Sequence, residues 1–288
     1  MARTVKIRWY RSTAINRNLE SSLFCIPSPS MLVSIPHVIP GDEIRVSATT
    51  YVAWKKCPDS ANVKLQGIYG PDSRPAFVGS LAHRIFSRHL SGGPIASDEF
   101  VQACREEIGG SNLNHKLSGL ELKPSALAGV IEEVRGLYER FVNFPGEGFE
   151  SSEVSIDIES DGDVRLLGTI DAVYREDLGG HRLVDWKTGE VGDAEDQLLF
   201  YSFLWAMEKE ELPAYVEAVS VKTGERYRAV PSLDDVTKVS SEVAVLVNEI
   251  RGAWERGESL IRTGGPWCRY CPILEECSEG RSATELLG

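Results

Sequence analysis

Two acids and a lysine lie close together between Gly168 and Tyr201, where the apolar pattern predicts neighbouring strands. Asp171 is on the first strand. Asp185 and Lys187 share one face of the second, because alternate residues of a strand point the same way. If the strands pair antiparallel, Asp171 lies beside Asp185. Carboxylates at that spacing repel unless a cation lies between them, and Mg²⁺ or Mn²⁺ prefers such oxygen ligands. The stretch therefore predicts a divalent metal site suited to activating water against a phosphodiester.

Each of these residues also has a purely structural interpretation. Asp185 and Lys187 could be a surface ion pair at the end of a hairpin. Gln197 and Tyr201 are four residues apart on an expected helix and share a face; either Tyr201 is core and Gln197 is solvated, or Gln197 binds near the metal and Tyr201 contacts DNA. A lone histidine in an apolar helix, such as His83, is more often part of the core, unless its helix faces the carboxylates.

The cysteines are concentrated near the C-terminus. The last three form a C-x2-C-x5-C pattern, which is one ligand short of a four-thiolate site. Cys57 is the best candidate for the fourth ligand because it precedes a proline, as Cys271 does. Cys25 and Cys104 compete, although Cys104 lies in an apolar helix and is expected in the core. The spacing is compatible with zinc or an iron–sulfur cluster and does not decide between them.

The surrounding elements follow from apolar periodicity. Helices are expected at 47–57, 79–90, 98–108 and 124–144. A three-strand meander is expected at 153–159, 164–174 and 181–187. A helix at 193–209, a hairpin at 216–230 and a long helix at 233–256 complete the pattern. We expect one compact domain over residues 46–288, preceded by an elaboration of unknown role, with strands and loops, at residues 1–45.

Composition sets only broad limits on function. The chain has 288 residues, of which 42% are hydrophobic and 26% charged, and its formal net charge is −12. An acidic balance argues weakly against nucleic-acid binding, because binding depends on local patches and because metal-site carboxylates add negative charge until the ion binds. No apolar run approaches the roughly 20 residues of a membrane helix. The N-terminal sequence also lacks the apolar core of a signal peptide. We therefore expect no membrane association, a cytoplasmic location and reduced cysteines.

Taken in order, these motifs resemble the RecB-type branch of the PD-(D/E)XK nucleases, especially members with an iron–sulfur staple. Such members include the AddB nuclease domain and the CRISPR-associated RecB-like exonucleases. The matching motifs are G-x3-H at 79–83, G-x2-D at 168–171, D-[YW]-K-[TS]-G at 185–189 and Q-x3-Y at 197–201. One cysteine ahead of these motifs and three behind them match the staple. The resemblance covers roughly residues 46–280.

The resemblance implies an α/β restriction-endonuclease-like core, with a central mixed sheet flanked by helices. It implies a 4Fe–4S cluster rather than zinc, joining the N- and C-terminal parts of the domain through Cys57, Cys268, Cys271 and Cys277. The metal ligands that it implies, for Mg²⁺ or Mn²⁺, are His83, Asp171, Asp185 and the main-chain carbonyl of Trp186. The catalytic set that it implies is Asp171, Asp185, Lys187, Gln197 and Tyr201.

The function expected from this resemblance is a metal-dependent DNA nuclease, an exonuclease acting on single strands or DNA ends. The expected setting is repair, recombination or phage and CRISPR-related defence. Trp54, Tyr69 and Trp186 are aromatics that could stack on bases. The sequence has no P-loop, so a helicase or integrase would be a separate subunit. The alternatives are a non-catalytic DNA-binding or scaffolding subunit of such a complex and a zinc-stapled protein of unrelated function.

Overall fold

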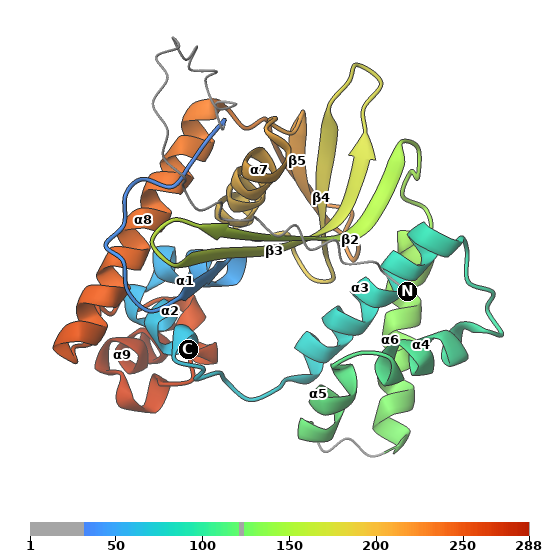
Figure 1. Cartoon of the computed structure of the whole chain (residues 1–288). Helices are drawn as coiled ribbons and strands as arrows, with labels where there is room; N and C mark the ends of the chain where they lie inside the picture. The colour runs from blue at the N-terminus through green and yellow to red at the C-terminus, as the bar shows by residue number, and fades with distance from the viewer. Residues whose placement is uncertain (1–31, 121–123, 288) are drawn as a thin grey trace, which may run out of the picture. The chain divides into compact units, whose positions relative to one another are not determined.

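A six-stranded mixed sheet forms the centre of the protein (Figure 1). A computed structural model describes residues 32–120 and 124–287. The strands are β1 (Ile44–Ser47), β2 (Phe149–Ser160), β3 (Val164–Arg175), β4 (His181–Lys187), β5 (Tyr215–Ser220) and β6 (Arg226–Ala229). Strands β2, β3 and β4 form the expected antiparallel meander, and β5 and β6 form the expected hairpin beside it. Strand β5 runs parallel to β4, which makes the sheet mixed.

Strand β3 is where the sheet forks. Strand β2 pairs along one side of it. On the other side, β1 pairs in parallel with residues 164–167, and β4 pairs antiparallel with residues 172–175. Residues 168–171 lie between these two ladders. Gly168, at the start of this gap, leaves no room for a Cβ, which would collide with Leu204 of the helix packed above it. The first glycine of the G-x2-D motif thus lets a helix approach the fork closely.

Two groups of helices bury the two faces of the sheet. Helices α3 (Arg74–Gly92), α4 (Phe100–Gly109), α5 (Leu113–Gly119) and α6 (Pro124–Phe141) share one apolar core with Val184 and Trp186 of β4. Helices α1 (Ala48–Lys56), α7 (Glu195–Lys209) and α8 (Leu233–Arg256) share the other core with Leu183. This alternation along β4 follows from the two-residue period of a strand and turns Asp185 toward α7. The expected mixed sheet with flanking helices is therefore confirmed.

The C-terminal segment folds beside the helix that follows Cys57. It contains two short 3₁₀ helices, η1 (Pro266–Tyr270) and η2 (Leu274–Glu276), and then α9 (Ser278–Leu287). Cys57 has an extended backbone, and Pro58 begins α2 (Pro58–Leu65), so the chain turns sharply between α1 and α2. Figure 1 shows α1, α2 and α9 on one side of the molecule and α3 to α6 on the other.

Several boundaries differ from the expectations. Helix α3 begins at Arg74 rather than at residue 79, because Ser73 accepts a hydrogen bond from Ala76 N and a proline follows in the first turn. Strand β2 begins four residues earlier than expected and is bulged near its start. Ser47 caps α1 and accepts a hydrogen bond from Thr50 N. The sequence did not predict α2, α5 and α9, which are short, with eight, seven and ten residues.

Residues just ahead of β1 are part of the main core. Val33 and Val38 are buried in the cluster shared with α8. Arg251 of α8 is buried and donates hydrogen bonds to the carbonyls of Ile39, Asp42 and Gly162. Strand β1 itself crosses the expected boundary at residue 45. Cys25 and the rest of residues 1–31 lie outside the described residues. In the part of the chain that is described, no helix is long and apolar enough to cross a membrane.

Candidate metal centre

Three acidic residues stand side by side on the three strands of the meander. Asp171 lies at the fork of β3, Glu153 is opposite it on β2, and Asp185 is opposite it on β4. These positions follow from the neighbouring pairs Ser152↔Ala172, Val154↔Ile170 and Ala172↔Val184. The predicted antiparallel pairing of the two motif strands is confirmed, and it brings Asp171 and Asp185 together at the point where hydrogen bonding between β3 and β4 stops.

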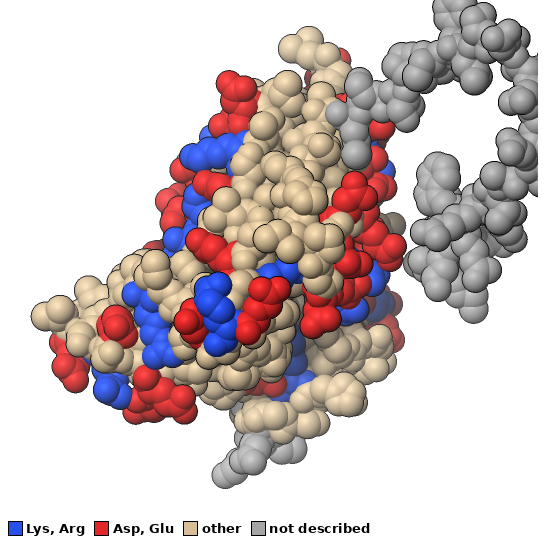
Figure 2. All heavy atoms as spheres, turned by 60° about the vertical axis from the view of Figure 1, so that its left-hand side comes forward, with Lys and Arg blue, Asp and Glu red and all other residues tan. Residues whose placement is uncertain are grey.

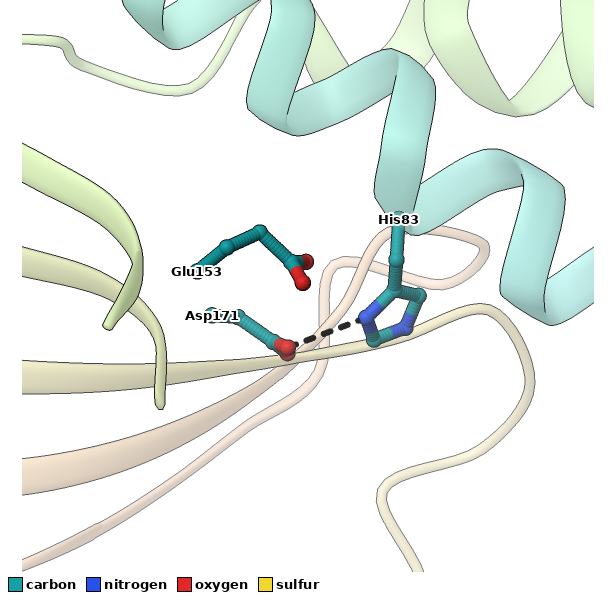
Figure 3. A group of neighbouring side chains, drawn as sticks. All are labelled: His83, Glu153 and Asp171. Carbon is teal, nitrogen blue, oxygen red and sulfur yellow. Dashed lines mark hydrogen bonds and ion pairs between the residues drawn. The ribbon is translucent and has the colours of Figure 1, made fainter. Parts of the chain in front are cut away.

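Helix α3 supplies a histidine to this row of acids (Figure 3). His83 Nδ1 lies 3.1 Å from Asp171 Oδ1. One ligand atom from each of His83, Glu153 and Asp171 lies within 4.8 Å of the others, which is a spacing suited to one metal ion. Gly79, one turn earlier, lies against Thr188 at the end of β4, where a Cβ would be only 3.2 Å from the hydroxyl oxygen. The glycine of G-x3-H thus permits the close approach that brings the histidine to the acids.

Glu153 is the residue of this group that sequence reasoning missed. It is half-buried and has a φ of +52°, in the left-handed region that side chains other than glycine rarely adopt. Such backbone strain persists only where surrounding structure enforces it, and it is concentrated at functional sites. The residue could have been found by counting back from Asp171 across the β2–β3 turn. The apolar alternation by itself marks Glu153 only as the start of a strand.

A second set of contacts lies on the α7 side of Asp185. Lys187 Nζ is 2.7 Å from Asp185 Oδ2 and donates to Gln197 Oε1 at 2.6 Å. The amide nitrogen of Gln197 donates to Asp185 Oδ1 and to the Tyr201 hydroxyl, both at 3.0 Å. The two motif residues of the helix are therefore neither solvated nor purely core. They join the acid and the lysine in one hydrogen-bonded group.

The charges of this group perturb one another strongly. Burial lowers the pKa of His83, but its hydrogen-bonded partner Asp171 and the other nearby carboxylates outweigh burial and raise the pKa to about 9. Burial and repulsion by Asp171 raise the pKa of Asp185 to about 6, against the opposing charge of Lys187. Burial and the same repulsion raise the pKa of Glu153. Without a cation, the site therefore retains protons that a cation would displace.

The donor set fits a hard divalent cation. Asp185 Oδ2 is buried and makes no hydrogen bond of suitable angle, although it is ion-paired with Lys187. Asp171 Oδ2 accepts a hydrogen bond from the backbone N–H of Trp186 at 2.7 Å, so this backbone runs directly beside the carboxylates. Two carboxylates, an imidazole and a nearby peptide group are ligands that Mg²⁺ and Mn²⁺ accept.

The three aromatic residues expected to stack on bases differ in the exposure of their rings. The Trp186 side chain is buried among Phe141 and Phe144 and is unavailable for stacking, because its neighbour Asp185 takes the other face of β4. Trp54 is partly buried and donates its indole N–H to Glu249. Tyr69 is exposed in the connection between α2 and α3.

The four cysteines of the expected staple line one small cavity. Three backbone N–H groups donate to their sulfurs: Thr263 to Cys57 at 3.4 Å, Gly265 to Cys268 at 3.3 Å and Gly280 to Cys277 at 3.2 Å. No three of these four sulfurs lie within 4.8 Å of one another. The cysteines thus share a cavity, but they do not form a ready-made group of ligands around a single point. Cys104 is buried in the other core, as expected.

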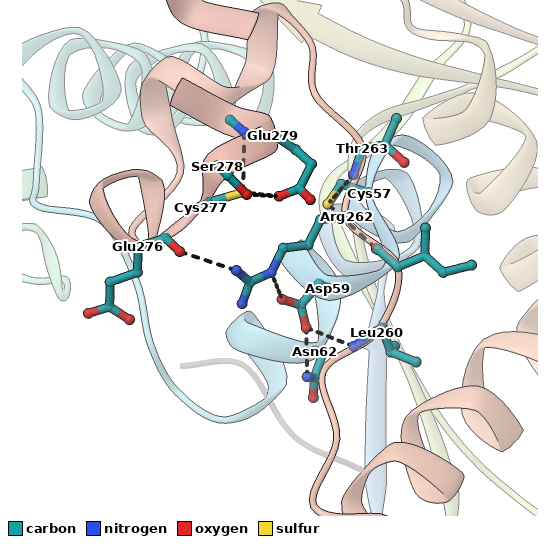
Figure 4. A network of polar contacts seen from close by, with 12 residues as sticks. Cys57, Asp59, Asn62, Leu260, Arg262, Thr263, Glu276, Cys277, Ser278 and Glu279 are labelled. Carbon is teal, nitrogen blue, oxygen red and sulfur yellow. Dashed lines mark hydrogen bonds and ion pairs between the residues drawn. The ribbon is translucent and has the colours of Figure 1, made fainter. Parts of the chain in front are cut away.

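A polar network ties α2 to the C-terminal segment next to these cysteines (Figure 4). Asp59 is buried and accepts hydrogen bonds from Arg262 Nε at 2.8 Å and from Leu260 N at 3.1 Å. It also accepts from the Asn62 amide at 3.0 Å, and its own N–H donates to the carbonyl of Ile261. These hydrogen bonds join the two parts of the chain.

Comparison with known proteins places the fold and the motifs in one family. The model of the PD-(D/E)XK nuclease superfamily matches residues 45–278. A search of curated proteins finds no match. Among solved structures, a candidate exonuclease from Eubacterium rectale matches with 14% identity and a TM-score of 0.47, over 75% of this chain and 83% of that one. The protein SSO0001 matches with 17% identity and a TM-score of 0.31, over 69% and 94%.

Neither structural match is close enough to carry an argument about function, so the assignment rests on the family model. That model spans the strands, the helices and the motif residues described above, and it covers most of the sequence. The chain belongs to the PD-(D/E)XK nuclease superfamily.

Proposed function

We propose that the protein is a metal-dependent DNA nuclease of the RecB type, hydrolysing phosphodiester bonds with Mg²⁺ or Mn²⁺. The observation that carries the proposal is the convergence of His83, Asp171, Asp185 and Lys187 at the fork of the sheet. Carboxylates beside a histidine and a lysine give a centre that can hold a cation and face an anionic substrate. A purely structural ion pair would account for Asp185 and Lys187, but not for the histidine that α3 directs at Asp171.

In this proposal His83, Asp171, Asp185 and the carbonyl of Trp186 hold the metal. The metal when bound would acidify a water molecule and neutralise charge that develops on the phosphate. Glu153 is a further ligand or a second-site carboxylate, since its ligand atom lies within 4.8 Å of those of His83 and Asp171. Because the pKa values of His83 and Asp185 are raised, a cation competes with their protons and binds better as the pH rises.

Lys187 then acts on the reacting phosphate or its attacking water. Its ammonium group lies between Asp185 and Gln197, so it is positioned on the metal side of β4. Gln197 accepts from this lysine and donates to Asp185, and it therefore fixes the relative orientation of the two. Tyr201 holds the Gln197 amide from the other side. Burial raises the pKa of Tyr201, so its hydroxyl stays neutral and serves as a hydrogen-bonding group.

We also propose that Cys57, Cys268, Cys271 and Cys277 hold a 4Fe–4S cluster that joins the two ends of the domain. All four line one cavity, and the backbone N–H groups that donate to three of the sulfurs would stabilise thiolates. A tetrahedral zinc with Zn–S bonds of about 2.3 Å would need sulfurs less than about 4 Å apart. No three of these sulfurs lie within 4.8 Å of one another, so the choice of an iron–sulfur cluster over zinc follows from the resemblance to RecB-type nucleases.

The substrate and setting are also proposals. Single-stranded DNA or DNA ends, in repair, recombination or defence, follow from the resemblance to RecB-type nucleases. A helicase or integrase would act as a separate subunit, in a cytoplasmic complex. We retain residues 1–45 as an elaboration of unknown role, although Val33, Val38 and the start of β1 pack with the nuclease core.

The direct test compares two aspartates of the same hairpin. Asp185→Asn removes a charge from the proposed centre, and Asp177→Asn makes the same change at an exposed position in the β3–β4 turn. End-labelled and circular single strands are incubated with Mn²⁺ and each protein. We expect Asp185→Asn to abolish cleavage and Asp177→Asn to cleave like the unmodified chain. Equal cleavage by both variants, or no cleavage by the unmodified chain, would refute the proposal. Cleavage of the linear strand but not of the circular strand identifies end dependence.

A further inference from the structure

A pocket of about 320 Å³ opens beside the proposed active site, between α1, α2 and the C-terminal segment. Gln197, which holds Lys187 and Asp185, is part of its lining. The lining also includes Lys56, Lys64, Trp267 and Tyr270. The volume lies within the range of small-ligand pockets, roughly 300–1,000 Å³. A chain segment leaving the active site on the Gln197 side would enter this pocket.

The lining is basic, apart from Cys271, which is one of the proposed cluster ligands. Lys56 and Lys64 are its charged side chains, and no Asp or Glu contributes to it. This is unusual for a chain with 43 acidic and 31 basic residues, and Figure 2 shows both signs interspersed on one face of the molecule. Neither lysine forms an ion pair with any residue in the described parts of the chain. Burial lowers the pKa of Lys64, and the charge of Lys56 adds to this effect, against an opposing contribution from the nearby Cys271. A bound anion would relieve both effects.

Two aromatic rings, those of Trp267 and Tyr270, also form part of the pocket lining. Tyr270 is 80% exposed, so its ring is open to a partner. Trp267 is partly buried and lies over Gly265, where a Cβ would collide with the indole. Lys56 Nζ is 6.0 Å from the centre of that indole ring. A cation beside an aromatic face is the arrangement with which proteins bind a phosphate and the base attached to it.

We propose that this pocket binds a nucleotide of single-stranded DNA next to the scissile phosphate, with its phosphate at Lys56 and Lys64 and its base against the exposed ring of Tyr270. A base must be unpaired to expose a face to an aromatic ring, so the pocket selects single strands over duplex. The pocket on the opposite side of the carboxylates is different, because its lining includes His83, Glu153 and Asp171 themselves. The inference rests on the proposed nuclease function and specifies where on the protein the DNA strand is bound.

The test measures binding without cleavage. A fluorescent oligothymidylate and the matching duplex are titrated with full-length protein in an Asp185→Asn background. Lys56→Gln with Lys64→Gln is compared with Lys222→Gln and Lys238→Gln, a pair of exposed lysines with the same charge change away from the pocket. We expect the pocket pair to weaken single-strand binding about tenfold more than the control pair. It should also reduce the slope of the logarithm of affinity against the logarithm of salt concentration by about 0.7 per lost phosphate contact.

Tyr270→Ala tests the stacking half of the proposal separately. We expect at least about a fivefold loss of single-strand affinity with an unchanged salt dependence, since stacking releases no counterions. Tyr270 is exposed, so the substitution removes no core packing, and an unchanged duplex affinity serves as its control. Equal losses in the pocket and control lysine pairs would overturn the proposal, as would an unaltered affinity of Tyr270→Ala.

The outcome is separable from that of the nuclease proposal. If the unmodified chain cleaves DNA but these variants bind normally, the pocket assignment alone fails. If the unmodified chain does not cleave DNA, the same titrations still report whether the pocket binds single strands. In cleavage assays, the pocket variants should raise KM for long single strands, and they should leave hydrolysis of bis(p-nitrophenyl) phosphate unchanged because this small ester cannot span the two sites.

Discussion

The carboxylate centre (His83, Glu153, Asp171 and Asp185) and the cysteine cavity (Cys57, Cys268, Cys271 and Cys277) each bring together four side chains from distant parts of the chain. The two sites differ in the secondary structure that carries them. The acids of the carboxylate centre lie on hydrogen-bonded strands, where Glu153, Asp171 and Asp185 occupy equivalent positions in register. The sheet ladder and the helix cores on both faces fix these positions whether or not an ion is bound. The acids consequently stand close together and perturb one another's pKa values.

Cys57 lies where α1 meets α2, and the other three cysteines lie in or beside the two short 3₁₀ helices. Their segment is held to α2 by the Asp59 network and by N–H groups that donate to sulfur. The proposed metal site is therefore preorganised by the sheet, whereas the geometry of the proposed cluster site depends more on what it binds. Removing the ligand should therefore affect catalysis at one site and stability at the other.

The largest expected effect separates these two roles directly. Asp171→Asn should reduce cleavage by about a thousandfold or more, because it removes a charge that His83 and the proposed metal both contact. It should leave the absorption of the proposed cluster, near about 400 nm, unchanged. Cys277→Ser should have the opposite pattern, losing that absorption and lowering the melting temperature while the carboxylate centre stays formed.

Cys104→Ser is the matched control for the cysteine variant, because Cys104 is buried in the other core, away from the cavity. Its absorption spectrum should equal that of the unmodified protein. A Cys277→Ser protein that keeps both its spectrum and its melting temperature would break the proposed division between the two regions.

The next largest effect concerns the network that holds the C-terminal segment. Asp59→Ala leaves Arg262 without its buried partner, and such a loss costs about 3–5 kcal/mol of folding stability. Denaturant unfolding would measure it, with Asp177→Ala as an exposed control that should change stability by less than about 0.5 kcal/mol. A small effect of Asp59→Ala would mean that the proposed cluster alone holds the segment.

The acidity of the carboxylate centre predicts a dependence of metal affinity on pH. His83 must be neutral to bind a metal, and its pKa in the free site is raised to about 9. A metal that binds at a lower pH must displace that proton, so Mn²⁺ affinity should rise about tenfold per pH unit from pH 6 to 8. Below about pH 6, Asp185 also takes up a proton, and the dependence should steepen.

Calorimetric titration of Mn²⁺ at several pH values measures this dependence. His83→Gln is the control, since it removes the titrating group and should flatten the profile above pH 6. A flat profile for the unmodified protein would show that metal binding does not displace a proton from His83.

The smallest effect concerns Glu153. Glycine adopts positive φ without strain, so Glu153→Gly should stabilise the fold or change it by no more than about 1 kcal/mol. It should nevertheless weaken Mn²⁺ binding, whereas Glu153→Asp should weaken it less. A loss of stability in the glycine variant, with metal affinity unaltered, would assign Glu153 a structural role instead.

The sequence predicted the parts of the site that depend on local order. The meander, the shared face of Asp185 and Lys187 and the helix of Gln197 follow from periods of two and 3.6 residues. The parallel pairing of β1 with β3 joins segments more than a hundred residues apart, and no local pattern specifies it. The position of Glu153 depends on the register of a long hairpin, and the orientation of Trp186 depends on which face each helix group covers.

Anomalous diffraction from a crystal soaked in Mn²⁺ tests the central claim most directly. The proposed centre predicts a peak within about 2.0–2.4 Å of His83, Asp171 and Asp185 oxygen or nitrogen atoms, at the fork of the sheet. The peak should vanish in Asp185→Asn and persist in Asp177→Asn. A soaked crystal that has no peak at this position, or one with Mn²⁺ bound elsewhere and an unaltered fork, would contradict the account.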